Sequence, residues 1–116
     1  MDSSVEDKSW QIRAEMALAS MAASNRLITY AELADAAGIE GRHRINRLTV
    51  WLEELIELDA KSGQPLRAAR VISQSRGGLP APGFFIKCAE LGLYDSAPGD
   101  KYNGPQAYEF HLTHLG

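Results

Sequence analysis

The chain has 116 residues, of which 45% are hydrophobic and 23% are charged, and its formal net charge is −3. This size and composition predict one globular domain over 1–116, with 1–4 as a loose N-terminus. The single cysteine, Cys88, excludes an internal disulfide, no apolar run approaches the roughly 20 residues that cross a bilayer, and the acidic start lacks a signal-peptide core. We therefore expect a cytoplasmic protein that does not contact a membrane.

Positive charge gathers in the middle third of the chain. Residues 41–80 hold seven Lys and Arg against four Asp and Glu, whereas 1–40 hold three against seven and 81–116 hold two against four. Phosphates are bound by local clusters of cations and do not require a positive total. The middle third is therefore the candidate surface for a nucleic acid, although such a patch is also common on proteins that bind none.

Two helices are predicted in the first 40 residues. The first covers about 5–23, where apolar residues recur at helical spacing after a pair at 4–7 that resembles a capping box. The second begins at Tyr30, because T-x-x-E at 29–32 forms a capping box. It ends at Gly38, since glycine readily adopts the left-handed conformation of a helix end.

A third helix follows after a short glycine-bearing turn and ends before Gly63. Its early arginines, Arg42, Arg44 and Arg47, stand where a recognition helix presents cations and backbone amides to DNA. The second and third helices together therefore predict a helix-turn-helix. The sequence places Ile45, Leu48, Leu52 and Leu55 on one apolar face of this helix, with Trp51 and Ile56 beside it. The acidic residues expected on a solvated face that repels phosphate are Glu53, Glu54, Glu57 and Asp59.

The rest of the chain is predicted to contain a strand, a loop and two short helices. Residues 66–73 favour a strand, and the glycines and prolines of 75–83 predict a wing-like loop or a tight crossover. Residues 84–92 predict a short helix closed by Gly92, and 105–115 fit a helix or a strand, with the helix preferred because a proline can open it. The whole pattern predicts a small, mainly helical α+β domain of winged-helix type.

Two segments carry a more specific pattern, ITYAELADAAG at 28–38 and PLRAARVISQSRGGL at 65–79. The first is similar to the I-T-Y-G-E-L-A segment of the DNA-binding domain of alkylguanine DNA alkyltransferases and of their non-enzymatic relatives, the alkyltransferase-like proteins. The second resembles the same family's P-C-H-R-V-x-x-S-x-G segment. The likeness covers roughly 28–92 and includes the short helix that holds Lys87 and Glu90. The resemblance implies a winged-helix fold that binds DNA.

The resemblance also implies roles for single residues. Tyr30 stands where the family's tyrosine presses on a phosphate as the target nucleotide rotates, and Arg44 where its arginine enters the base stack. The family's reactive cysteine and the histidine after it are replaced by Ala68 and Ala69, so alkyl transfer lacks its thiolate and its base. We therefore expect a non-enzymatic nucleic-acid-binding module without a cofactor or a metal. Its predicted DNA contacts are Tyr30, Arg42, Arg44, Arg47 and Arg70.

The alternative to a DNA-binding module is a protein-interaction domain, such as a small regulator or inhibitor of a larger protein. Trp51 and Tyr102 would anchor that partner if they are exposed. His111 and His114 have i, i+3 spacing, but a metal site needs further ligands, so a solvated or terminal pair is expected and an enzyme built on them ranks third. Cys88 is expected to act as a small buried hydrophobe.

Overall fold

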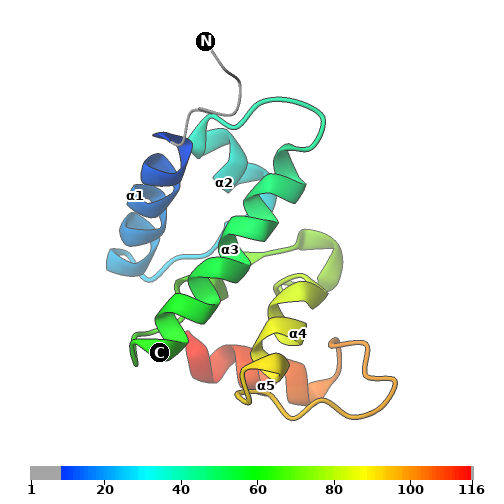
Figure 1. Ribbon diagram of the computed structural model, residues 1–116. Helices are drawn as coiled ribbons and strands as arrows, with labels where there is room; N and C mark the ends of the chain where they lie inside the picture. Colours follow the sequence, from blue (N-terminus) through cyan, green and yellow to red (C-terminus); the bar gives the residue numbers. More distant parts are fainter. Residues whose placement is uncertain (1–8, 116) are drawn as a thin grey trace.

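The structure of the chain is a computed structural model that describes residues 9–115 (Figure 1). Within these residues it is a small, mainly helical α+β fold with five α-helices and a two-stranded parallel sheet. The elements in chain order are α1 (Ser9–Ala23), β1 (Ile28–Thr29), α2 (Tyr30–Ala37), α3 (Arg44–Lys61), the 3-10 helix η1 (Arg67–Arg70), β2 (Val71–Ile72), the 3-10 helix η2 (Gln74–Arg76), α4 (Pro82–Glu90) and α5 (Pro105–His114). The predicted N-terminal tail and the first turn of the first predicted helix lie outside the described residues.

Helix α3 runs through the middle of the molecule, and the other elements pack around it (Figure 1). On the α1 side, Trp10 meets Trp51 of α3 edge to face, with ring centroids 5.6 Å apart. The same helix is contacted by α2, α4 and η1. On the far side of α4, Phe110 of α5 lies against Phe84, with ring centroids 6.1 Å apart. No helix within 9–115 has the length and hydrophobicity that a membrane span requires.

The apolar face predicted for α3 is the core of the fold, with one exception. The buried α3 side chains are Leu48, Trp51, Leu52, Leu55, Ile56 and Asp59. Ile45 is expected among them, but it is 39% exposed. This expectation is wrong because Ile45 lies in the first turn, where the helix has not yet reached the elements that cover its later turns. The helix ends at Lys61, and Gly63 two residues later has φ +69°, as predicted for its stop.

Both ends of α2 form as the sequence predicts. The Thr29 hydroxyl accepts the Glu32 N–H at 3.1 Å, and the Glu32 carboxylate accepts the Thr29 N–H at 3.0 Å, which completes the capping box. At the other end, Gly38 has φ 73°, a conformation that glycine adopts at little cost. A Cβ at Gly38 would also lie 3.3 Å from the guanidinium of Arg13, which donates to the Ala37 carbonyl.

The strand predicted over 66–73 is mostly wrong, because only Val71–Ile72 is extended. These two residues pair in parallel with β1, in the register Ile28 to Val71 and Thr29 to Ile72. Residues 67–70 instead form η1, where the small side chains of Ala68 and Ala69 are buried. β-branched side chains favour strands, and in this segment they begin only at residue 71, which explains the short pairing.

The predicted loop at 75–83 begins with η2 and is closed by an isolated antiparallel bridge between Ser73 and Leu79. Gly77 has φ 68°, and a Cβ there would lie 2.6 Å from the Tyr108 hydroxyl of α5. The next helix begins at Pro82, two residues before its predicted start. The ambiguous segment at the end of the chain is helical, as preferred, with a proline in its first turn.

Helix α5 is joined to η1 by the buried His111. The His111 ring donates an Nε2–H to the Ala69 carbonyl at 2.7 Å. Burial lowers the pKa of His111, so the neutral ring that makes this bond is favoured. The expectation of a solvated or terminal histidine pair is therefore wrong for His111, while His114 is half-buried and its ring lies 4.3 Å from that of Phe110.

Replacing Thr29 with alanine removes one half of the capping box, and we expect the free energy of unfolding to fall by about 1 kcal/mol. Chemical denaturation of the wild type and of Thr29→Ala measures this difference. Thr113→Ala is the matched control, because the Thr113 hydroxyl only bonds the Glu109 carbonyl on an exposed helix face and its removal should change stability by less than about 0.5 kcal/mol. Equal effects of the two substitutions would contradict the capping role.

Acid should destabilise the fold through the histidines of α5. Burial lowers the pKa of His111 and of His114 below the usual 6.5, so the unfolded chain takes up protons at a higher pH than the folded chain. Their contribution is complete above pH 6.5 and is lost as the pH falls from there through the lowered pKa. His111→Gln, which can still donate to Ala69, should flatten the pH dependence of unfolding below pH 6.5. An unchanged slope in His111→Gln would refute this account.

Candidate nucleic-acid interface

Three of the five predicted DNA contacts lie together at the N-terminal end of α3. Arg42 is in the turn before the helix, Arg44 is its first residue and Arg47 lies one turn later. Tyr30 opens α2, and Arg70 ends η1. Helix α3 is about 27 Å long, and η1 packs near its C-terminal end, where Arg67 bonds Asp59. Arg70 therefore lies far from Arg42, Arg44 and Arg47 (Figure 1).

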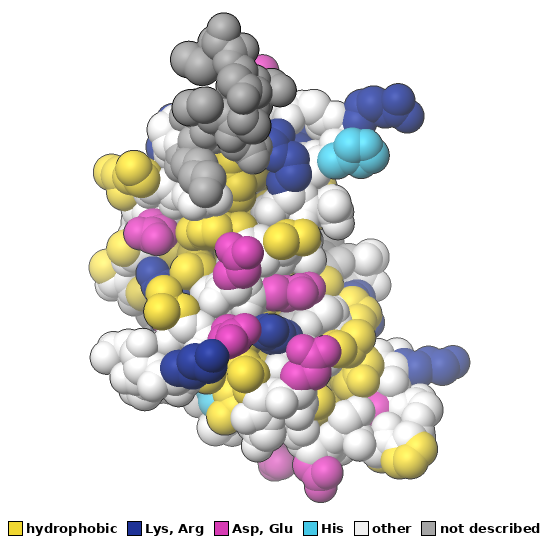
Figure 2. All heavy atoms as spheres, in the orientation of Figure 1, with side chains coloured by type: hydrophobic (Ala, Val, Ile, Leu, Met, Phe, Trp, Pro, Cys, Tyr) yellow, Lys and Arg dark blue, Asp and Glu magenta, His cyan; other side chains and the backbone are white. Residues whose placement is uncertain are grey.

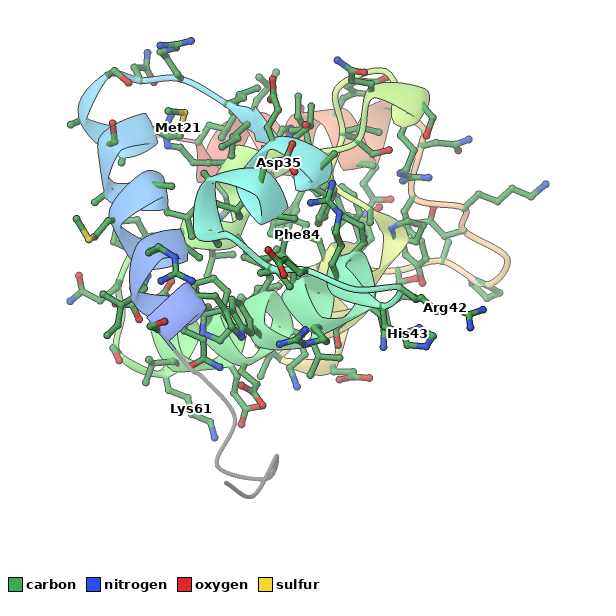
Figure 3. The ribbon with its side chains drawn as sticks, turned by 90° about the horizontal axis from the view of Figure 1, so that it is seen from above. Met21, Asp35, Arg42, His43, Lys61 and Phe84 are labelled. Carbon is green, nitrogen blue, oxygen red and sulfur yellow. The ribbon has the colours of Figure 1, made fainter. Side chains whose placement is uncertain are left out.

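Arg42 is the most accessible of these cations. Its side chain is exposed and makes no hydrogen bond or ion pair with any residue in 9–115. Figure 3 shows Arg42 and His43 projecting away from the body of the molecule. His43 is the N-cap of α3, but within the described chain its side chain makes no capping hydrogen bond, and no acidic residue lies in the first turn. The first backbone N–H groups of α3 therefore lie close to basic side chains, and no side chain of the described residues caps them.

Arg44 and Arg47 both make contacts near this helix end. Arg44 forms an ion pair with Asp35 of α2 at 2.6 Å, in which the carboxylate side chain is 71% exposed. Exposed pairs of this kind stabilise a fold by about 0–1 kcal/mol, so Arg44 can exchange Asp35 for another anion at small cost. Arg47 donates to the Glu40 carbonyl at 3.1 Å, and its guanidinium lies 5.9 Å from the ring centroid of Trp10.

The Tyr30 side chain points into the fold. Its hydroxyl accepts the backbone N–H of Ala81 at 2.9 Å, which links the start of α2 to the start of α4. Burial raises the pKa of Tyr30, so the phenol stays protonated at neutral pH. A hydroxyl has one donor and two acceptor positions, so the Tyr30 O–H is still available to donate while Ala81 is bound.

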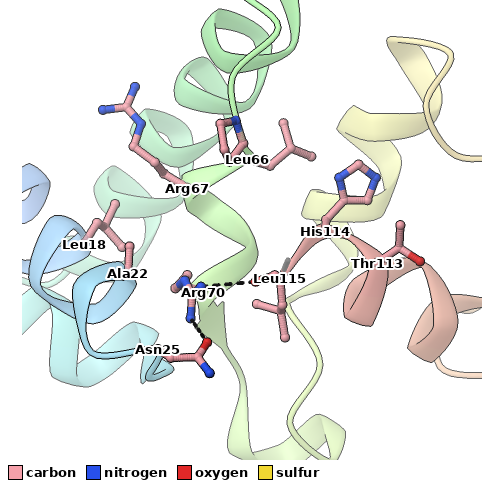
Figure 4. A pocket seen from close by; sticks show the side chains of 10 residues that line it. Leu18, Ala22, Asn25, Leu66, Arg67, Arg70, Thr113, His114 and Leu115 are labelled. Atoms are coloured by element: carbon pink, nitrogen blue, oxygen red, sulfur yellow. Dashed lines mark hydrogen bonds between the residues drawn. The ribbon is translucent and has the colours of Figure 1, made fainter.

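Arg70 joins three segments that are distant in the sequence. Its Nη1 donates to the Asn25 side chain at 3.2 Å and to the Arg26 carbonyl at 3.3 Å, and its Nη2 donates to the Leu115 carbonyl at 3.1 Å (Figure 4). All three acceptors are neutral. In this structure Arg70 holds the α1–β1 turn and the end of α5 against η1.

The second half of α3 is acidic and separates the arginine-bearing end from the rest of that face. Glu53, Glu54 and Glu57 lie along this half of the helix. Figure 2 shows acidic side chains gathered across the middle of the face in view, with basic and histidine side chains above them. Glu57 is bonded to Lys61 at 2.7 Å and to Lys87 of α4 at 3.1 Å, and these two cations lower its pKa. The prediction of a solvated acidic face is thus met by the glutamates.

The prediction that Asp59 lies on the solvated acidic face is wrong, because Asp59 is buried. Its relative exposure is 3%, and it accepts three hydrogen bonds from Arg67, one from the backbone N–H and two from the guanidinium at 2.9 and 3.0 Å. The sequence does contain a signal for this pair, since Asp59 continues the i, i+3, i+4, i+7 spacing of the buried Leu52, Leu55 and Ile56. A carboxylate on an apolar stripe requires a partner, because burial of an unpaired charge is costly.

Both aromatic anchors proposed for a protein partner are engaged in the fold. Trp51 is only 6% exposed, so it does not meet the condition under which it would anchor a partner. Tyr102 is half-buried and stacks on Phe85, with ring centroids 5.9 Å apart and planes 3° apart. Burial of an aromatic ring removes a large apolar area from water, which favours packing of both side chains against the fold.

Two kinds of side chain in 9–115 bear on enzymatic chemistry, the cysteine thiol and the possible metal ligands. Cys88 is fully buried, as expected, and burial raises the pKa of its thiol to about 12. A thiol with this pKa holds very little thiolate at neutral pH. Over 9–115, no three His, Cys, Asp or Glu side chains gather in a way that could hold a metal ion.

Comparison with known proteins adds no family to this description, since no family model, no curated protein and no solved structure matches the chain.

Proposed function

We propose that the chain is a non-enzymatic nucleic-acid-binding module of winged-helix type, which contacts duplex DNA through the N-terminal end of α3. The observation that carries the proposal is the convergence of Arg42, Arg44 and Arg47 on a first helical turn that has neither an acidic residue nor a side-chain cap among the described residues. Backbone amides at a helix N-terminus and nearby arginines are the groups that bind phosphate in many DNA-binding proteins.

Each arginine has a distinct place in this proposal. Arg42 reaches a phosphate without breaking a hydrogen bond or ion pair, because it makes none within 9–115. Arg44 exchanges the exposed Asp35 carboxylate for a phosphate oxygen. Arg47 extends the cationic surface by one turn. Tyr30 has a positioning role, because its hydroxyl accepts from Ala81 and so holds the start of α2 against the start of α4.

Arg70 has a positioning role in the proposal. It keeps the α1–β1 turn in place, and β1 leads directly into α2, the helix that precedes the recognition helix. The helix-turn-helix order of α2 and α3 and the loop closed by the Ser73–Leu79 bridge support a winged-helix assignment.

The absence of an enzymatic step is supported by the state of the one cysteine. Transfer of an alkyl group to a protein requires an accessible thiolate, and Cys88 is buried with a raised pKa. The position of the family's reactive cysteine is held by Ala68, a buried residue of η1. The module would therefore recognise DNA and leave its chemistry unchanged.

A protein partner is the second candidate, and it would use a different surface from the one predicted. Val50 and Leu58 of α3 and Ile86 of α4 are 51%, 57% and 43% exposed, next to the glutamates Glu53 and Glu57. A mixed apolar and acidic face of this kind fits a partner that presents apolar and basic side chains. It is the candidate to pursue if DNA does not bind.

The DNA proposal is tested by fluorescence anisotropy of a labelled duplex at several salt concentrations. We expect binding that weakens as salt increases, and we expect Arg42→Ala and Arg44→Ala each to reduce the log–log slope by about 0.9, the value for one phosphate that the protein no longer neutralises. Lys101→Ala is the matched control, because Lys101 is an exposed cation in the loop between α4 and α5 that has no partner among the described residues. Its slope should equal that of the wild type.

Two results would reject the proposal. One is the absence of binding at low salt, and the other is an equal reduction of slope in Lys101→Ala and Arg42→Ala, which would indicate unspecific attraction to any cation. A duplex with one alkylated guanine, titrated in parallel, tests the family resemblance separately from DNA binding. Tighter binding to that duplex would support recognition of the lesion, and equal binding would limit the module to undamaged DNA.

A further inference from the structure

A cleft of about 690 Å³ lies between α1, η1 and the end of α5, away from the proposed DNA surface (Figure 4). Its apolar side chains come from three segments, with Leu18 and Ala22 on α1, Leu66 before η1 and Leu115 after α5. Arg70 lies between the α1 side and the α5 side. The volume falls within the range of about 300–1,000 Å³ that is usual for small-molecule sites.

The charge in this cleft is unbalanced. Arg67 also lines it, but the buried Asp59 compensates its charge through two guanidinium hydrogen bonds. Arg70 has only neutral acceptors within 9–115. Counted over the described residues alone, one net positive charge therefore remains at the wall of a largely apolar cleft.

The hydrogen-bonding capacity of Arg70 is also only partly used. A guanidinium has five N–H donors, and three of them are used by Asn25, Arg26 and Leu115. With respect to the described residues, the Nε–H and one Nη2–H are left. The Nε and Nη2 atoms lie on the same edge of the guanidinium, and an edge of this kind can bind a carboxylate.

We propose that this cleft binds a small amphipathic monocarboxylate, with its carboxylate on Arg70 and its apolar body against Leu18, Ala22, Leu66 and Leu115. A single uncompensated cation matches a single negative charge, whereas a polyphosphate would bring more charge than Arg70 balances. A neutral apolar ligand would fill the cleft and leave the two remaining N–H groups of Arg70 without acceptors, at a cost in affinity.

The test is a titration of the full-length protein with sodium decanoate and, separately, with 1-decanol, followed by amide shifts in two-dimensional NMR. Decanoate should cause saturable shifts that centre on the end of α1, on η1 and on 113–115, and it should bind at least tenfold more tightly than decanol. Arg70→Gln should remove this preference for the charged ligand. Equal affinity for the two ligands, or shifts centred elsewhere, would overturn the proposal.

A second pair of variants keeps the test decisive if Arg70→Gln does not fold. Ala22→Phe places a ring in the cleft, whereas Ala23→Phe adds the same ring at an exposed neighbour that does not line it. We expect Ala22→Phe to abolish the decanoate shifts and Ala23→Phe to retain them. Retention of binding in Ala22→Phe, or its absence in both variants, would show that the cleft is not the site.

Discussion

The burial of α3 is the constraint on which the rest of the structure depends. An isolated helix of this length is marginally stable in water, so α3 requires the neighbours that cover Leu48, Leu52 and Leu55. These neighbours are α2, η1 and α4, together with Trp10 of α1. They leave exposed mainly the first turn of α3 and a band of glutamates. The helix is thus basic at one end and acidic along its second half, which restricts any phosphate contact to the arginine-bearing end.

Polar contacts fix the segment that apolar packing alone would hold poorly. Residues 66–72 include Ala68 and Ala69, whose small side chains bury little area, and three charged or polar groups hold this segment in place. Arg67 bonds Asp59, Arg70 joins two distant turns, and His111 bonds the Ala69 carbonyl. Two of these groups, Arg67 and Arg70, also line the cleft. The proposed ligand site is in this way a consequence of how η1 is held.

Local signals in the sequence are enough to predict the helices, and contacts between distant residues explain the failures. The capping box at Thr29 and the glycine after α2 act within a few residues, so they are visible in the sequence. The strand predicted over 66–73 is too long because the chain turns into η1 to reach Asp59 and α5. The burial of Trp51 depends on Trp10, a residue 41 positions earlier. Among the predicted DNA contacts, Arg42, Arg44 and Arg47 share one helix end because they are neighbours in the sequence. Arg70 is distant from them in the sequence and lies in another part of the fold.

In the proposed function, the arginine-bearing end of α3 binds DNA and the end of the molecule around Arg70 does not. The most direct measurement is an NMR titration of the protein, labelled with nitrogen-15, with an unlabelled duplex at low salt. If DNA binds at the N-terminal end of α3, the amide shifts should concentrate in residues 41–48 and at the start of α2. The amides around Asn25 and Leu115 should change little. Shifts centred on Arg70 and its partners, or no shifts at all, would contradict the proposed function.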